Sequence, residues 1–453
     1  MDNFLNFAQA AASNIGLYGI TFLLILSLLV FVHEWGHYIV ARLCGVRVEV
    51  FSIGFGREIW GFDDKHGTRW KISMIPLGGY VKMFGDTDPA SAGHVDAEVL
   101  NSYERDVAFF AKPVRKRAAI VFAGPAINFL FAILILAVLY GFVGKPITPP
   151  HAMGVEIGGS ADAAGFMPHD IVKTVNGKEI ESFDNIKREV MLALDTPMNF
   201  VVEREGKIVE LTATPKKVVE TDRFGFKHEL GFLGLIGPAN GLDIKSIVKI
   251  NGKPVSSADE ALQIVRSNLD KDMVLEMSGG KEGASMRVRP PAALNGNIAS
   301  EGNPEFNILV LGVRPGDEVR KMGPADAVVE AVSDTGSIIA DTLKALGQMV
   351  TGTRSANELG GIIRIGAIAG DMAERGMLAL ATFTALLSIN LGLINLFPIP
   401  MLDGGHLVFY TLEAIKGKPL SERVQEYAFR FGLVVLVCLM VFANLNDIIQ
   451  LVL

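Results

Sequence analysis

Two histidines and a glutamate lie close together in an apolar stretch near the N-terminus. In the run His33-Glu34-Trp35-Gly36-His37 the two imidazoles are four residues apart, so in a helix they share one face and can bind one metal ion. Two neutral imidazoles with a third ligand suit a catalytic zinc ion, which keeps one position open for water. Glu34 can take a proton from that water, which predicts a metal-dependent hydrolase.

The apolar surroundings of this motif support a functional reading. An ionisable side chain in the middle of a bilayer costs roughly 2.5–3.5 kcal/mol on insertion scales, so it usually faces the protein interior and has a role there. The alternative is a pair of hydrogen-bonded histidines and a paired glutamate inside a helix bundle. Three such residues at metal-ligand spacing exceed what packing requires, and we favour the metal site.

A third ligand must come from another part of the chain. His151, His169 and His228 fall in a long, more polar segment that is expected outside the membrane, so they are not expected to reach the motif. Asp403 and His406 are the other candidates, because they follow a proline-containing break at the end of a later apolar segment. The residues alone leave these two as alternatives.

The composition indicates a membrane protein with a water-soluble part. Of the 453 residues, 50% are hydrophobic and 20% are charged, against about 25% charge in an average soluble protein. The 49 acidic residues outnumber the 42 basic ones, which argues against nucleic acid as a partner. Two cysteines are too few for a disulfide scaffold or a four-cysteine zinc site.

Four segments are apolar enough to cross a bilayer as helices, which takes about 20 residues. They are expected at 17–40, 118–143, 376–397 and about 428–446. Lysine and arginine gather at the ends of these segments that border 42–117 and 404–427, so the positive-inside rule places both loops in the cytoplasm. Both termini and the segment 144–375 then lie outside.

The outer segment repeats itself. Residues 171–180 return as 247–255, with Asn176-Gly177 and Asn251-Gly252 aligned at an offset of 75 residues. Each copy predicts strand, Asn-Gly turn, strand, helix and strand. Two unrelated hairpins that share a common turn are the alternative. Residues 323–350 have apolar side chains at helical spacing and predict an amphipathic helix.

These motifs together resemble those of the site-2 intramembrane zinc metalloproteases of the RseP type, the regulator of sigma-E protease family with tandem PDZ domains. The resemblance rests on residues 33–37, on Gly-Pro-Ala-Ile-Asn-Phe at 124–129 and on 395–405, and it covers nearly the whole chain. It implies a polytopic α-helical membrane protein with four transmembrane helices, two inserted PDZ-like α+β domains and a membrane-associated β-hairpin region.

This architecture divides the chain into five expected parts. A first membrane part, 1–143, contains the β-hairpins at 45–84, and a second, 376–453, contains the last two helices. The PDZ-like domains are expected at 144–236 and 237–316, and the amphipathic helix with a connecting segment at 317–375.

Carried over by position, the resemblance implies that His33, His37 and Asp403 hold one Zn²⁺ and that Glu34 is the general base. It therefore favours Asp403 over His406 as the third ligand.

Further residues are expected to contact substrate: Asn395, Asn128 and the turn formed by Gly54, Phe55 and Gly56. An edge strand in the hairpins at 47–56 and 68–83 could hold a substrate extended by backbone pairing. An ordinary cytoplasmic hairpin is the alternative.

The implied activity is hydrolysis of peptide bonds within the membrane segments of single-span membrane proteins. The resemblance implies anti-sigma factors, already cut once outside the membrane, and remnant signal peptides as substrates. It also implies a bacterial inner membrane, with both termini and the PDZ-like domains in the periplasm and the active site near the cytoplasmic side. The PDZ-like pair could act as a size filter, which we favour, or read the C-terminus of a trimmed substrate.

Two other function classes compete with the protease. A catalytically inactive PDZ scaffold would not need Glu34. A zinc-handling membrane protein would need polar residues along a path through the membrane, and the second apolar segment offers mainly Asn128.

Overall fold

The computed structural model describes residues 2–85, 101–278, 285–296, 308–313 and 319–452. Four helices contain stretches long and apolar enough to cross a membrane, and each overlaps one of the four predicted spans. These helices are α1 (Asp2–Leu43), α3 (Val114–Phe142), α10 (Met377–Asn395) and α12 (Glu422–Val452). The last helix is longer than predicted, because Asn446 and Asp447 are buried against the chain around 357–364 instead of ending the helix in water.

Helix α3 lies at the centre of the bundle and contacts α1, α10, α8 (Pro324–Thr351) and α11 (Asp403–Lys416). Small residues allow these close approaches. A Cβ atom added to Gly36 of α1 would lie 2.5 Å from the Ala123 carbonyl oxygen of α3, and one added to Gly392 of α10 would lie 3.0 Å from that of Pro125. The helix α8 confirms the predicted amphipathic helix.

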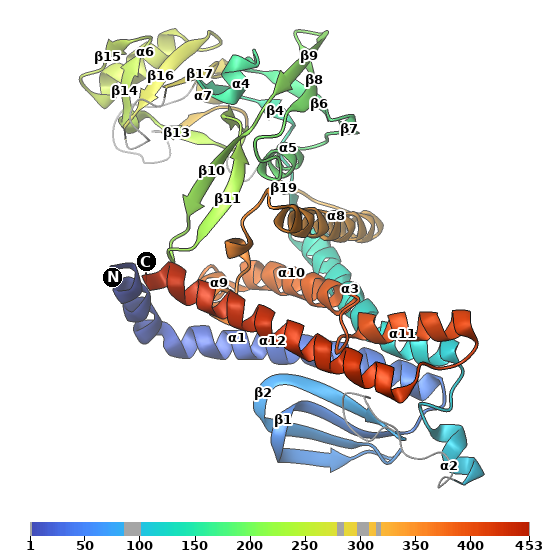
Figure 1. Ribbon diagram of the computed structural model, residues 1–453. Helices are drawn as coiled ribbons and strands as arrows, with labels where there is room; N and C mark the ends of the chain where they lie inside the picture. The colour runs from blue at the N-terminus through green and yellow to red at the C-terminus, as the bar shows by residue number, and fades with distance from the viewer. Residues whose placement is uncertain (1, 86–100, 279–284, 297–307, 314–318, 453) are drawn as a thin grey trace.

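The predicted hairpin region forms a sheet from β1 (Val48–Asp63) and β2 (Arg69–Met83), which lies beside α1 (Figure 1). Both strands bend back on themselves. Val50 and Phe51 pair on one side with Lys82 and Val81 and on the other with Arg69 and Trp70. The segment 79–83 is therefore at an edge of this sheet, and the register of the described residues gives it strand partners on one side only.

The end of this sheet around residues 55–60 and 72–75 is rich in exposed apolar side chains: Phe55, Ile59, Trp60, Phe62, Ile72, Met74 and Ile75. Exposed apolar side chains gathered at one end of a sheet are typical of a region that contacts a membrane or another protein.

Two α/β units lie on one side of the helices (Figure 1). The first sheet has the order β4-β6-β8-β9 with β7 on β6, and the second has the order β12-β5-β17-β16-β14-β15. The strands of the first are β4 (His151–Ala152), β6 (Asp170–Val175), β7 (Lys178–Glu179), β8 (Met198–Arg204) and β9 (Lys207–Ala213), with helices α4 (Ser160–Ala163) and α5 (Phe183–Met191). The strands of the second are β5 (Gly154–Glu156), β12 (Leu235–Ile236), β14 (Ile247–Ile250), β15 (Lys253–Pro254), β16 (Met273–Met277) and β17 (Ser285–Val288), with helices α6 (Ala258–Ser267) and α7 (Ala292–Asn295).

The predicted repeat is confirmed at the level of strands, turn and helix. Asn176 and Asn251 both adopt left-handed backbone conformations, with φ of 50° and 51°. The side-chain oxygen of Asn176 accepts a hydrogen bond from Asn199 N, and that of Asn251 accepts one from Val274 N, both at 2.9 Å. The same turn, with the same hydrogen bond from the strand that follows the helix to the asparagine side chain, thus recurs at the predicted offset of 75 residues.

The sheet of the second unit contains two strands from the range predicted for the first unit. Strands β5 and β12 precede the second unit in sequence, yet both belong to its sheet, where β5 pairs with β17. The predicted limits at 144–236 and 237–316 stay a prediction. Parts of the second range, at 279–284, 297–307 and 314–316, lie outside the described residues.

A long hairpin, β10 (Lys216–Thr221) and β11 (Lys227–Phe232), reaches from the first unit to the helix bundle (Figure 1). Its buried Phe226 packs against Ala367 and Leu451. Ala367 belongs to α9 (Ile362–Glu374), a helix that the sequence analysis did not predict, and whose N-terminus is capped by the carboxylate of Asp447. Shorter elements are α2 (Ser102–Val107), β3 (Lys145–Pro146), β13 (Gly241–Asp243), β18 (Ile308–Val310) and β19 (Val319–Arg320).

Candidate metal centre

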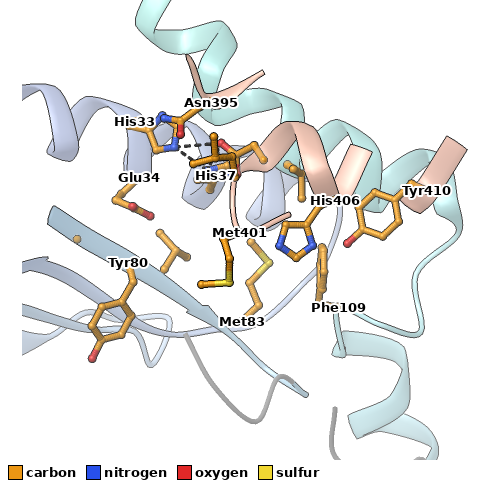
Figure 2. A pocket seen from close by; sticks show the side chains of 15 residues that line it. His33, Glu34, His37, Tyr80, Met83, Phe109, Asn395, Met401, His406 and Tyr410 are labelled. Carbon is orange, nitrogen blue, oxygen red and sulfur yellow. Dashed lines mark hydrogen bonds and ion pairs between the residues drawn. The ribbon is translucent and has the colours of Figure 1, made fainter. Parts of the chain in front are cut away.

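Three side chains converge where α1 meets the first residue of α11. The Nε2 atoms of His33 and His37 are 3.2 Å apart. Asp403 Oδ2 lies 3.1 Å from the first and 3.5 Å from the second. Figure 2 shows the two imidazoles facing this common point from α1. Among the described residues, this is the one group of three histidine, cysteine or acidic side chains arranged to hold a metal ion.

The donor set fits zinc. Zinc–nitrogen and zinc–oxygen bonds of about 2.0–2.1 Å in a tetrahedral arrangement place neighbouring ligand atoms about 3.3 Å apart, close to the three separations seen here. Asp403 Oδ2 is buried, and none of the described residues makes a hydrogen bond of good geometry to it; its nearest polar neighbours are the two imidazole nitrogens. A buried carboxylate oxygen in this position is costly, and a cation between it and the imidazoles would compensate it.

Helix α3 supports the histidines from behind. The Nδ1 atom of His37 lies 2.9 Å from the carbonyl oxygen of Ile120, and the Nδ1 atom of His33 lies 3.0 Å from the side-chain amide of Asn128. Between these positions, Gly124 leaves room for the rings, since a Cβ atom there would lie 2.3 Å from His37 Nε2.

Asp403 is positioned by the tight turn that follows α10. Met401 adopts a φ of 89°, which a side chain rarely allows, and two glycines follow Asp403 in α11. A Cβ atom at Gly404 would lie 2.2 Å from the carbonyl oxygen of Phe397, and one at Gly405 would lie 2.5 Å from that of Ile399. The first turn of α11 is thereby pressed against 397–399, which brings Asp403 to the histidines.

His406 is not part of the group of ligand atoms, although it lines the same cavity. Its ring packs near Phe429, with 5.3 Å between the ring centroids. Figure 2 shows it turned toward Phe109, away from the imidazoles of α1. Of the two alternatives left open by spacing, the structure brings Asp403 to the histidines.

Glu34 faces a cavity of about 210 Å³ in front of the metal centre. Figure 2 shows its carboxylate pointing into this space beside the histidines. The backbone of Val81, in the edge segment of β2, lies within hydrogen-bonding reach of the carboxylate. Asn395, at the end of α10, lines the cavity as well. A carboxylate, an amide and an open strand edge thus surround one candidate zinc site.

The remaining predicted substrate contacts lie elsewhere. Gly54, Phe55 and Gly56 do not line the cavity, because the segment 79–83 stands between the first half of β1 and the site. Asn128 is fully buried behind His33 and does not line the cavity either. Tyr80, Met401 and Phe109 line it without having been predicted. Tyr80 lay within the predicted hairpin, whereas Phe109 carries no sequence signal that would have identified it.

Comparison with known proteins agrees with this geometry. The profile of peptidase family M50 matches residues 21–439. A protein of Agrobacterium fabrum named "Putative zinc metalloprotease" is 37% identical over 449 residues, which cover 99% of this chain and 100% of the relative. The "Regulator of sigma-E protease RseP" of Salmonella typhimurium is 35% identical over 451 residues, covering 94% of this chain and 97% of the relative. The chain therefore belongs to peptidase family M50 and is a membrane zinc metalloprotease.

Proposed function

We propose that the protein cuts single-span membrane proteins within their membrane segments, with Zn²⁺ held by His33, His37 and Asp403. The observation that carries the proposal is the convergence of these three ligand atoms beside the carboxylate of Glu34, among helices apolar enough to span a bilayer. When bound, zinc polarises the scissile carbonyl and makes a water molecule more acidic. Glu34 takes the proton of that water and later delivers it to the leaving amine. The amide of Asn395, which lines the cavity, is proposed to hydrogen-bond the substrate backbone.

The edge segment 79–83 is proposed to hold the substrate. The peptide bonds of a membrane helix are hidden in internal hydrogen bonds, so a substrate must unwind before it can be cut. An extended peptide can add to a free sheet edge and keep its backbone paired. Gly79 supports this assignment, because it lets the edge run close to α1: a Cβ atom there would lie 2.7 Å from a methyl group of Val30 and 3.3 Å from Glu34.

We infer that the cavity lies near the cytoplasmic face of a bacterial inner membrane. The basic residues Arg115, Lys116 and Arg117 lie in the first turn of α3 and are the last residues of the loop 42–117 that is predicted to be cytoplasmic. The start of α1 and the end of α12 lie together at the end of the bundle reached by the β10–β11 hairpin, which supports a common, periplasmic side for them and the two α/β units (Figure 1).

The two α/β units are proposed to be PDZ-like and to act as a size filter for substrates. Their shared strand–turn–strand–helix pattern supports the first point. A groove of about 530 Å³ in the first unit, between α5 and residues 230–235, favours the second candidate role, in which the unit binds the C-terminus of a trimmed substrate. We propose anti-sigma factors as one substrate class, in keeping with the mention of sigma-E in the name of the Salmonella relative, and remnant signal peptides as another.

Cleavage of a tagged single-span peptide by the purified protein tests the proposal. We expect mass spectrometry of the products to place the cut inside the apolar segment, and chelation followed by Zn²⁺ to abolish and restore it. Zinc binding without cleavage would favour a zinc-handling protein. Binding of the peptide without zinc and without cleavage would favour a scaffold.

A further inference from the structure

Helix α3 presents one face to both imidazoles of the metal centre. Ile120, Gly124 and Asn128 are four residues apart on this face, the spacing that also separates His33 from His37 on α1. Ile120 contacts His37, Asn128 contacts His33, and Gly124 leaves space for the rings between them. Each histidine of α1 therefore has one contact residue on α3.

The contact at His37 fixes the ring nitrogen that carries the proton. A carbonyl oxygen only accepts hydrogen bonds, so the Nδ1 atom facing Ile120 at 2.9 Å must be the protonated one. The Nε2 atom then keeps its lone pair for a metal ion. Metal-binding histidines almost always donate their second ring N–H to an acceptor, which fixes the ring and raises its basicity. His33, whose Nε2 atom faces the same point, needs such an acceptor too.

We propose that Asn128 is this acceptor, a positioning residue that holds His33 through its side-chain oxygen and does not contact substrate. The residue is 0% exposed, and among the described residues no donor reaches its Oδ1 atom. Its Nδ2 atom is the one that faces His33, at 3.0 Å. A half-turn of the amide exchanges the two atoms and sets the oxygen opposite the Nδ1–H of a metal-binding His33.

A hydrogen bond from α10 fixes the backbone of Asn128. The hydroxyl of Ser388 in α10 donates a hydrogen bond of 2.8 Å to the backbone carbonyl of Asn128. Ser388 is 0% exposed, so this tie is buried in the bundle. The amide can therefore turn about its last side-chain bond while its backbone stays in register with His33.

The zinc affinity of the full-length protein in detergent tests the proposal, which rests on the ligand set proposed above. Asn128→Leu removes the acceptor at similar size, and we expect it to raise the zinc dissociation constant, measured by chelator competition, about 10- to 100-fold. Asn128→Asp keeps an acceptor and is expected to bind zinc at least as tightly as the wild type. Asn390→Leu is the control: it replaces a half-buried asparagine of α10 that is not part of the candidate metal centre, and it is expected to leave zinc affinity unchanged.

Two results would overturn the role of Asn128. One is an unchanged zinc affinity in Asn128→Leu with only a raised KM, as expected of a substrate contact. The other is weaker zinc binding by Asn128→Asp, which decides the question even if the leucine variant does not fold. The visible absorption of the Co²⁺-loaded protein gives a second readout, because it should shift in the leucine variant and not in Asn390→Leu.

His33→Ala separates this proposal from the ligand set. If His33→Ala loses zinc while Asn128→Leu keeps it, the role of Asn128 is wrong and the ligand set stands. If His33→Ala retains wild-type zinc affinity, the ligand set itself is wrong.

Discussion

At the scale of single residues, two glycines allow the candidate ligands to meet. Gly36 lies between the histidines on α1 and faces the backbone of α3, and Gly124 lies on α3 and faces the imidazoles. Neither residue has a chemical role. Both remove side-chain volume where α1 packs against α3, but only Gly124 faces the imidazoles, so a methyl group added at Gly124 should act directly on zinc binding.

We predict that Gly124→Ala weakens zinc binding at least about tenfold, since the new methyl group would lie 2.3 Å from His37 Nε2 and must displace a ligand. Gly141→Ala is the matched control in the same helix, because its nearest neighbour would be 3.9 Å away. Chelator competition measures both variants. Equal zinc affinity in Gly124→Ala and the wild type would contradict the proposed position of His37 in the site.

Asp403→Ala is expected to lose most of its zinc and its activity, because a site with three protein ligands is left with two. His406→Ala should keep its zinc, since its ring packs near Phe429 outside the ligand group. Metal analysis of the purified variants decides between them, and the reverse ranking would make His406 the ligand.

The residues of the site differ in how far the sequence could predict them. His33 and His37 were predictable, because a spacing of four fixes a common helix face whatever the rest of the fold does. Asp403 and His406 could not be separated by spacing, because the outcome depends on the turn at Met401 and on the packing of Gly404 against the backbone. The burial of Asn128 behind His33 depends on contacts between distant segments, which one sequence does not reveal.

At the scale of elements, the edge segment 79–83 and the turn at 64–68 fix the sheet against α1. Asp64 accepts hydrogen bonds from the Tyr38 hydroxyl of α1, from the Trp70 ring nitrogen and from the backbone N–H groups of His66 and Thr68. This single carboxylate therefore ties the turn to the helix that carries the histidines.

Gly79→Ala is expected to lower kcat while leaving zinc affinity unchanged. The added methyl group would lie 2.6 Å from the Ser52 carbonyl oxygen and 2.7 Å from Val30, so the edge segment must move away from α1. Because Gly79 touches none of the proposed ligands, the effect should appear only in catalysis. Wild-type kcat in this variant would argue against the edge as the substrate platform.

The turn at Asp64 should loosen in acid. Partial burial by itself raises the pKa of the Asp64 carboxyl, but hydrogen bonds from Trp70, Thr68 and His66 outweigh it and lower the pKa to about 2. A lowered pKa contributes stability above the ordinary value of 3.8, and this contribution is lost as the pH falls toward 2. Trp70 fluorescence should report the change between these values in the wild type, and Asp64→Asn should lack this step.

At the scale of the whole molecule, the β10–β11 hairpin joins the two α/β units to the helices near the termini. Besides burying Phe226, it is held by Arg354, which donates a hydrogen bond of 2.7 Å to the Glu229 carbonyl oxygen, and by Arg223, which pairs with Asp371 of α9. The repeat and the four spans were predictable from local patterns. The hairpin contact and α9 were not, because they depend on residues more than eighty positions apart.

The chemistry of the substrate end distinguishes the two roles proposed for these units. If they act as a size filter, the wild type should cut a short stub equally well with a carboxylate or an amide at its outer end, and should spare a substrate with a folded outer domain. If the groove beside α5 binds the C-terminus, the amidated stub should be cut more slowly. Equal cleavage of all three substrates would contradict both roles.

Cysteine labelling in intact cells tests the orientation of the molecule. A cysteine placed at Ser160, in the first α/β unit, should react from outside the inner membrane, whereas one at Ser102, at the start of α2, should react only after the membrane is opened. Labelling of both positions from outside would contradict the proposed topology.

The most direct test of the central claim is cleavage of a single-span substrate by purified Glu34→Gln with its zinc content measured in the same sample. The amide keeps the shape of the side chain and loses its basicity. We expect wild-type zinc content and a rate reduced at least about 100-fold, the lower bound for loss of a general base. A zinc-loaded variant that cuts at nearly the wild-type rate would contradict the assignment of Glu34 and the mechanism built on it.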